Sequence, residues 1–325
     1  MRKIIIGIHG LGNKPPERLL KNWWKKSIKE GLKAVGQPNI FFNFESVYWA
    51  KFLHPDPLNP KIEDKENPLY ISEPYLPAKN YIKKKPSELR KKILDYVEKQ
   101  MDKLLLNEDK SINLSAVTDL IIHRYFRDLE LYYSSKCISE NRKECLVRDI
   151  LRNKLARIIE KHQDKEIMLI AHSMGSIIVY DVLTQTIPNL FIDTLVTIGS
   201  PLGLPIVVSK IISEQKNLLH RGNSIKTPEN VSRNWYNFSD LEDKVAIDYS
   251  LAGDYQMNSR KIQVIDKAVY NNYEINGHRN PHKAYGYLRT PELAEIITRF
   301  LNRDKPNFMI WLNKNLSRVW TAKLR

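Results

Sequence analysis

The sequence is poor in cysteine and contains no long apolar run. Only Cys137 and Cys145 occur in 325 residues, too few for a framework of several disulfides or a four-cysteine zinc site. Their surroundings predict a helix, and a separation of eight residues along a helix disfavours a bond between them. We therefore expect a reducing compartment, by default the cytoplasm. No segment approaches about 18 consecutive apolar residues, so no membrane-spanning helix is predicted.

The overall composition is that of a globular protein with surplus positive charge. Hydrophobic residues make up 42% and charged residues 27% of the chain, which excludes disordered, collagen-like and coiled-coil proteins. Lys and Arg outnumber Asp and Glu by 52 to 37, giving a net charge of +15. Such a surplus is compatible with binding to nucleic acid, with binding to an anionic membrane surface, or simply with a lysine-rich soluble protein. No nucleic-acid recognition motif accompanies it, so we expect no nucleic-acid partner.

Apolar runs alternate with helical patterns in most of the chain. Residues 4–8 form a β-branched run typical of a strand buried on both faces of a parallel sheet. Short connections between later strands and helices predict an α/β fold with helices on both faces of a mostly parallel sheet. Residues 202–234 are expected to be irregular. The other expected strands are 40–49, 167–171, 194–198, 235–238 and 262–265, and the expected helices are 15–35, 151–162, 175–183 and 291–300.

The alternation is interrupted after the second predicted strand. Seven of the 17 prolines fall between Pro55 and Pro86, which excludes regular structure over most of that stretch. Helical stripes follow at 89–104 and 117–125. We interpret 51–144 as a loop-and-helix insertion into a catalytic core formed by 1–50 and 145–303. The insertion either caps the active site or packs on the core.

Residues 304–325 form a basic, amphipathic C-terminal tail. On a helical wheel Phe308, Leu312, Leu316, Val319 and Trp320 fall on one side, and Lys314, Arg318 and Arg325 fall on another. Such a helix either docks on its own domain, which is the commoner arrangement, or lies on an anionic lipid surface. The positive surplus is concentrated in this tail and in residues 14–33. The sequence therefore raises the hypothesis that the tail makes peripheral contact with a membrane.

The sharpest chemical signal is the pentapeptide Ala-His-Ser-Met-Gly at residues 171–175. It lies between a predicted strand and a predicted helix, where a nucleophile elbow presents its serine on a strained turn. The positions two before and two after the serine must be small, and Ala171 and Gly175 satisfy that requirement. We therefore identify Ser173 as the candidate nucleophile. The alternative is a strand-to-helix junction that happens to contain serine.

Acyl transfer also needs backbone N–H groups directed at the developing oxyanion. One would come from Met174, which follows the serine. The other would come from the loop His-Gly-Leu-Gly at residues 9–12, whose glycines allow the N–H of Leu11 to turn toward the site. His9 itself is more typical of a structural, hydrogen-bonding histidine than of a catalytic one.

The general base is sought among the histidines that follow Ser173, which are His220, His278 and His282. In this type of fold the acid precedes the base along the chain, and His220 precedes the acid candidates. We favour His282, because it comes just before an aromatic pair and the closing helix. His278 remains the competitor.

The acid is sought on the loop that follows the predicted strand at 235–238. Asp243 lies two residues before an apolar residue, Val245, which is the usual placement of such an acid. Asp240 is the second choice, and its structural role would be to cap the turn.

These motifs resemble those of the α/β-hydrolase fold, in its lipase and esterase branch. IIIGIHGLG resembles the oxyanion strand and loop of compact bacterial lipases, and AHSMGS resembles their nucleophile elbow. TIGSPLG, DLEDKVA and NPHKAYGYL resemble the next strand and the acid and base loops. The likeness covers 1–50 and 145–303. The insertion departs from compact lipases, so their open, lidless site is not implied.

The resemblance implies a serine carboxylester hydrolase acting through an acyl-enzyme, with Ser173 as nucleophile, His282 as base and Asp243 as orienting acid. Its substrate would be an ester or acyl compound, either a small molecule or a lipid. No cofactor or metal is required. A thioesterase or acyltransferase would use the same residues. A non-catalytic binding module with a hydrolase fold is the alternative outside enzymes.

Overall fold

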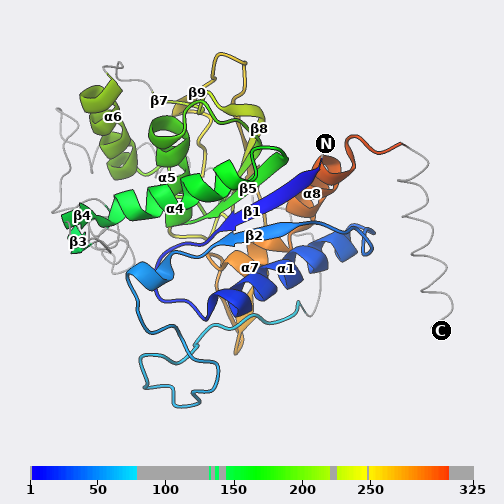
Figure 1. The fold of residues 1–325 in the computed structure, drawn as a ribbon. Helices are drawn as coiled ribbons and strands as arrows, with labels where there is room; N and C mark the ends of the chain where they lie inside the picture. Colours follow the sequence, from blue (N-terminus) through cyan, green and yellow to red (C-terminus); the bar gives the residue numbers. More distant parts are fainter. Residues whose placement is uncertain are drawn as a thin grey trace.

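A sheet of six parallel strands forms the centre of the computed structural model (Figure 1). The structure describes residues 2–78, 132, 136–138, 144–219, 225–246 and 249–306. The strands lie in the order β10-β8-β6-β5-β1-β2. They are β1 (Lys3–Ile8), β2 (Phe44–Val47), β5 (Glu166–His172), β6 (Ile192–Ile198), β8 (Val231–Ser239) and β10 (Val264–Ala268).

The register of the sheet brings the carboxyl ends of its central strands together. Ile8 of β1 is paired with Ala171 of β5, and His172 is paired with Ile198 of β6. Ile198 is in turn paired with Phe238 of β8. Segments far apart in the sequence therefore leave the sheet side by side at one edge. In open α/β sheets this edge is where ligands bind.

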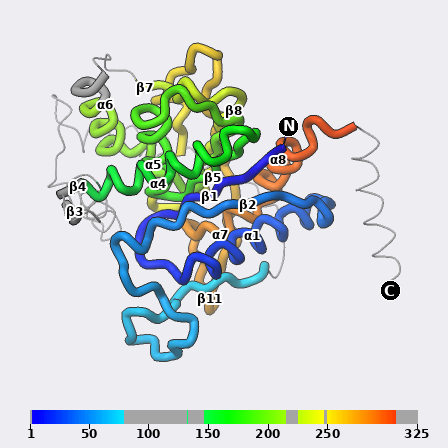
Figure 2. The backbone as a smooth tube through the Cα atoms, viewed as in Figure 1, coloured from blue at the N-terminus to red at the C-terminus, as the bar shows by residue number. Residues whose placement is uncertain are grey.

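Helices cover both faces of the sheet, as Figures 1 and 2 show. One face packs against α1 (Glu17–Ala34), α7 (Ala284–Leu288) and α8 (Pro291–Asn302), in a core that joins Trp24 to Leu293. The other face packs against α4 (Val147–Lys161), α5 (Met174–Asp181) and α6 (Pro205–Leu219), in a core that joins Leu155 to Ile177. A π-helical turn, η3 (Val182–Thr186), continues α5. The α/β architecture expected from the sequence is confirmed.

Some expected elements differ from those observed. The expectation of an irregular 202–234 is wrong, because α6 occupies Pro205–Leu219 and β8 begins at Val231. Ile206, Val207 and Val208 have low helix propensity, but Val207 and Ile211 pack into the core and stabilise the helix. The expected strand at 40–49 shortens to β2. Two small sheets were also not expected: they pair β7 (Ile225–Lys226) with β9 (Tyr255–Gln256), and β11 (Glu274–Ile275) with β12 (His278–Arg279).

The helical expectation for the two cysteines is also wrong. β3 (Lys136–Ile138) and β4 (Glu144–Leu146) form an antiparallel pair in which Cys137 is the direct partner of Cys145. A helical separation therefore no longer argues against a bond between the two residues.

The segment after β2 passes through a short 3-10 helix, η1 (Ala50–Phe52), and then has neither helix nor strand up to residue 78. Figure 2 shows it running past α1. The expected helical stripes at 89–104 and 117–125 and the tail residues Phe308–Trp320 lie outside the described residues. The division into core, insertion and tail stays a prediction. None of the described helices is long and apolar enough to cross a membrane.

A buried ion-pair network joins the helices of the second face. Arg152 of α4 donates from Nη2 to Asp181 Oδ2 of α5 at 2.6 Å and to Glu214 Oε2 of α6 at 3.1 Å. Tyr132 donates its hydroxyl to the same Asp181 oxygen at 2.8 Å. Burial raises the pKa of Asp181 to about 6. The carboxylate therefore depends on the guanidinium for compensation.

Replacing Arg152 with Met should lower the free energy of unfolding by about 3–5 kcal/mol, because it leaves a buried carboxylate without its cation. Urea unfolding at pH 7.5 measures the change. Arg157→Met, at an exposed position of the same helix, is the control and should stay within about 0.5 kcal/mol of the parent. Equal losses in the two variants would contradict the role of the network.

Candidate active site

Ser173 occupies a strained turn between β5 and α5. Its φ of 54° and ψ of −131° place a non-glycine residue in a region that side chains rarely adopt. Its N–H donates to the carbonyl of Ile198 at 3.1 Å, which anchors the turn to β6. Such strain persists only where the surrounding structure enforces it. The geometry is that of the elbow which the sequence pattern predicts.

Two glycines allow the loop after β1 to approach this turn. A Cβ on Gly10 would lie 2.6 Å from the Cβ of Ser173, and a Cβ on Gly175 would lie 2.9 Å from the carbonyl oxygen of His9. Both distances are shorter than real Cβ contacts, so neither position accepts a side chain without a shift. The small residue at 175 is thus needed for contact with the end of β1.

His282 joins Ser173 to Asp243. Its Nε2 lies 3.0 Å from Ser173 Oγ, and its Nδ1 lies 2.9 Å from Asp243 Oδ2. The structure thus brings together the three residues favoured from the sequence. Of the two competing histidines, it is His282 and not His278 that contacts both the serine and the acid; His278 pairs with Ile275 between β12 and β11.

The Asp243 carboxylate is buried and saturated with hydrogen bonds. Besides the imidazole, Oδ1 accepts the N–H of Val245 at 2.9 Å and Oδ2 accepts the hydroxyl of Tyr287 at 2.7 Å. Burial, together with the neighbouring Asp243, raises the pKa of Tyr287 well above its ordinary value, so the phenol stays a donor. Charge-assisted hydrogen bonds of this kind fix the position of the carboxylate.

Asp240, the second-choice acid, connects two loops instead of orienting the imidazole. Its Oδ2 accepts from Arg279 Nη1 at 2.7 Å and from the N–H of Asn271 at 2.7 Å. Its Oδ1 accepts the N–H of Glu242 at 2.8 Å, which caps the turn. This partly buried ion pair ties the loop of the acid to the loop of the base.

Asn271 holds the backbone on both sides of His282. Its side-chain amide donates to the carbonyl of Pro281 at 2.7 Å and to that of Lys283 at 2.8 Å. Asn280 Oδ1 accepts the N–H of His282 itself at 3.0 Å. Neither asparagine was singled out from the sequence, because the contacts join loop residues that no motif relates.

His172, which precedes the serine, holds the base from the other side. Its Nε2 donates to the backbone carbonyl of His282 at 2.7 Å, and the two rings lie 4.8 Å apart between centroids. Burial and then the charge of His282 lower the pKa of His172 well below its ordinary value, so it stays a neutral donor. The elbow motif contains this residue but predicts no role for it. Its position next to the serine is the one signal available.

Leu11 and Met174, the predicted oxyanion donors, lie next to the nucleophile. Met174 is the first residue of α5, whose first N–H groups have no partner within the helix. Leu11 follows Gly10, at which a Cβ would lie 2.6 Å from the Cβ of Ser173. Lys14 Nζ donates to the carbonyls of Leu11 and Gly12, the latter at 3.0 Å. The ammonium thereby holds the carbonyl side of the loop.

His9 has a structural place, as its residue type suggests. Its Nδ1 donates to the carbonyl of Gly10 at 2.7 Å, and its Nε2 accepts the N–H of Trp49 at 3.1 Å. Burial lowers the pKa of His9 well below its ordinary value, which keeps the ring neutral. His220 lies outside the described residues. Among the residues that the structure describes, no group of three or more His, Cys, Asp or Glu is arranged to hold a metal ion.

This arrangement has the parts of a nucleophilic acyl-transfer site: a serine, a base within hydrogen-bond reach and an acid that orients the base.

Residues 137–194 match a family model described as an alpha/beta hydrolase of unknown function. The match includes the elbow and ends before Asp243 and His282. No curated protein matches the chain. Together with the parallel sheet, the family match confirms the α/β-hydrolase fold.

His172 is expected to act as a positioning residue for His282. His172→Ala should slow the reaction of Ser173 with a fluorophosphonate probe about 10- to 100-fold, because the base loses the contact that holds its backbone. His172→Gln, which keeps a donor of similar reach, should recover part of the rate. Equal rates in the Ala and Gln variants, with both folded by circular dichroism, would leave the hydrogen bond without a role.

Tyr287→Phe removes the hydroxyl that donates to Asp243 and that accepts the backbone N–H of Asp240 at 2.9 Å. The free energy of unfolding should fall by about 1.5–3 kcal/mol, as expected for a hydrogen bond to a charged group. Tyr285→Phe is the matched control, since the structure describes no hydrogen bond from the hydroxyl of this neighbouring buried tyrosine. Denaturant unfolding of the two variants in parallel gives the difference, and a Tyr287 variant no less stable than the control would refute the assignment.

Proposed function

We propose that this α/β-hydrolase-fold protein is a serine carboxylester hydrolase of the lipase or esterase type. The observation that carries the proposal is the continuous hydrogen-bonded chain from Ser173 through His282 to Asp243, which starts at a strained elbow. A hydroxyl is a poor nucleophile without such a base, and the base needs a fixed acid. The enzyme would act on an ester or acyl compound.

The first half-reaction follows from the positions of the three groups. Nε2 of His282 accepts the proton of Ser173 Oγ as this oxygen attacks the ester carbonyl carbon. The imidazolium that forms is stabilised through Nδ1 by Asp243, whose buried carboxylate has no need to reorganise. The N–H groups of Leu11 and Met174 then stabilise the oxyanion. His282 returns its proton to the departing alcohol, leaving an acyl group on Ser173.

The second half-reaction uses the same groups in reverse. Water enters where the alcohol left and gives a proton to His282 while its oxygen attacks the acyl carbonyl. Collapse of the second tetrahedral intermediate releases the acid and returns the proton to Ser173. The neutral His172 adds no charge beside the imidazolium, because its pKa is held low by burial.

The same residues would serve a thioesterase or an acyltransferase, in which sulfur leaves or an alcohol replaces water. The surroundings of the site decide between these reactions. A non-catalytic binding module is disfavoured, because binding alone needs no saturated acid and no base aligned on a strained serine. The cytoplasm stays our expected compartment for the protein.

Hydrolysis of 4-nitrophenyl butyrate tests the proposal. Ser173→Ala, His282→Ala and Asp243→Asn should each lower kcat/KM by about 10³-fold or more, as for other triads whose members act as a unit. His278→Ala, at an exposed position of β12, should change it less than threefold. Full activity of Ser173→Ala would rule the mechanism out. Loss of activity in His278→Ala with retention in His282→Ala would reverse the assignment of the base.

A further inference from the structure

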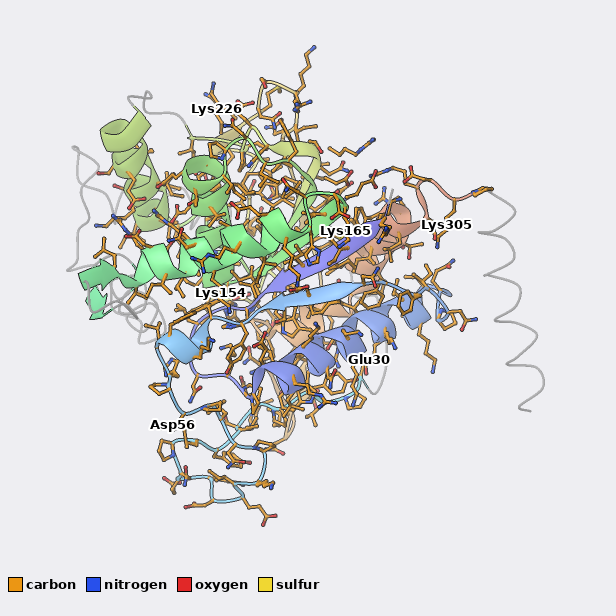
Figure 3. The ribbon with its side chains drawn as sticks, viewed as in Figure 1. Glu30, Asp56, Lys154, Lys165, Lys226 and Lys305 are labelled. Carbon is orange, nitrogen blue, oxygen red and sulfur yellow. The ribbon has the colours of Figure 1, made fainter. Side chains whose placement is uncertain are left out.

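A cluster of positive charge lies around the loop that follows β1. Lys14 extends from this loop, and Lys51 belongs to η1 after β2. Lys154 comes from α4, and Figure 3 shows it between that helix and the segment after β2. Three elements thus each contribute a lysine near the edge of the sheet where Ser173 lies.

The segments that carry Lys14 and Lys51 are fastened together. Trp49 donates from its indole to the carbonyl of His9 at 2.9 Å. The carbonyl of Lys14 accepts the N–H of Leu58 at 3.0 Å. These bonds hold the chain after β2 against the oxyanion loop, so the relative positions of the two lysines are set by the fold.

Lys51 and Lys154 share one aromatic ring. Their Nζ atoms lie 5.4 Å and 5.7 Å from the centroid of the ring of Phe52, a residue that is 40% exposed. Within the part of the chain that the structure describes, no carboxylate lies within ion-pair distance of either ammonium. A ring face attracts a cation but does not neutralise it. The two positive charges are therefore held close together without an anion from the described chain.

The electrostatic effect of the cluster reaches two buried histidines near the turn of Ser173. After burial, the charge of Lys51 is the next cause of a lowered pKa at Lys154, and the charge of Glu17 acts in the opposite direction. The charges of Lys14 and Lys154 contribute to the lowered pKa of His9. Lys14 also lowers the pKa of His172, the neighbour of the serine. The charge of Lys14 thus acts on both of these buried histidines, and the charge of Lys154 acts on His9.

We propose that Lys14, Lys51 and Lys154 form a cationic subsite that binds an anionic group, phosphate or carboxylate, of the ester substrate cleaved at Ser173. The inference rests on the proposed hydrolase function and adds a substrate class to it. The like charges of Lys51 and Lys154, held on one ring without a carboxylate from the described chain, are costly unless an opposite charge joins them. An anion on the substrate supplies that charge and places the ester next to the serine.

Two matched pairs of esters test the subsite and locate the anion. The first pair is 1-butyrylglycerol 3-phosphate and 1-butyrylglycerol, with the charge on the alcohol. The second is mono-4-nitrophenyl glutarate and 4-nitrophenyl butyrate, with the charge on the acyl chain. In at least one pair the anionic ester should have a kcat/KM about tenfold higher at low salt, and the advantage should shrink toward 0.5 M salt as screening grows, with a Debye length of about 4 Å.

The double variant Lys51→Met/Lys154→Met should bring the ratio of anionic to neutral kcat/KM close to one. The control is Lys226→Met/Lys305→Met, which removes two charges from positions that Figure 3 shows well away from Lys154, and it should keep the parent ratio. A parent enzyme that favours the neutral ester in both pairs overturns the proposal. So does a double variant with an unchanged ratio.

Binding separates this proposal from the hydrolase function. In the Ser173→Ala protein, glycerol 3-phosphate or glutarate should bind at low salt, whereas glycerol should not, as titration calorimetry can measure. Adding Lys51→Met/Lys154→Met should weaken that binding at least about tenfold. If no ester is cleaved and this binding is still lost in the lysine variant, the hydrolase proposal fails and the subsite stands. If esters are cleaved and neither anion binds, the subsite fails alone.

Discussion

The left-handed turn at Ser173 is the constraint on which the rest of the site depends. A serine with a φ of 54° needs a rigid strand before it and a packed helix after it. β5 and α5 supply both, since each is almost wholly buried. The turn also requires close neighbours without side chains, and Gly10 and Gly175 are placed where a Cβ would collide. The conformation of Ser173 therefore depends both on the register of the strands and on the positions of the two glycines.

The base and the acid lie on loops, and further contacts are needed to hold these loops in position beside the turn. Arg279 and Asp240 join the two loops through a partly buried ion pair. Asn271 brackets His282, and Tyr287 saturates Asp243. His172 completes the support from the nucleophile side. Because each contact fixes backbone or carboxylate position, the imidazole stays within reach of the serine without help from a ligand.

Much of this arrangement could be predicted from the sequence, wherever a local pattern of residues indicates a structure. The β-branched run at 4–8 predicted a buried strand, and the elbow motif predicted the position of Ser173. Chain order reduced the base to two histidines, and the structure places His282 at the serine. The fastening residues were missed because hydrogen bonds between loops leave no periodic signal. The helix α6 was missed because core packing outweighs the low helix propensity of its β-branched first residues. The pairing of Cys137 with Cys145 was missed because β3 and β4 have only three residues each.

The most direct test of the central claim is to find the acyl group on the protein. A 4-nitrophenyl ester is mixed with the protein, quenched with acid within the first turnover and analysed by peptide mass mapping. We predict one acyl group per chain, on Ser173, and a burst of nitrophenolate of equal stoichiometry. Turnover with no acyl group on Ser173, or with the group on another residue, would contradict the account.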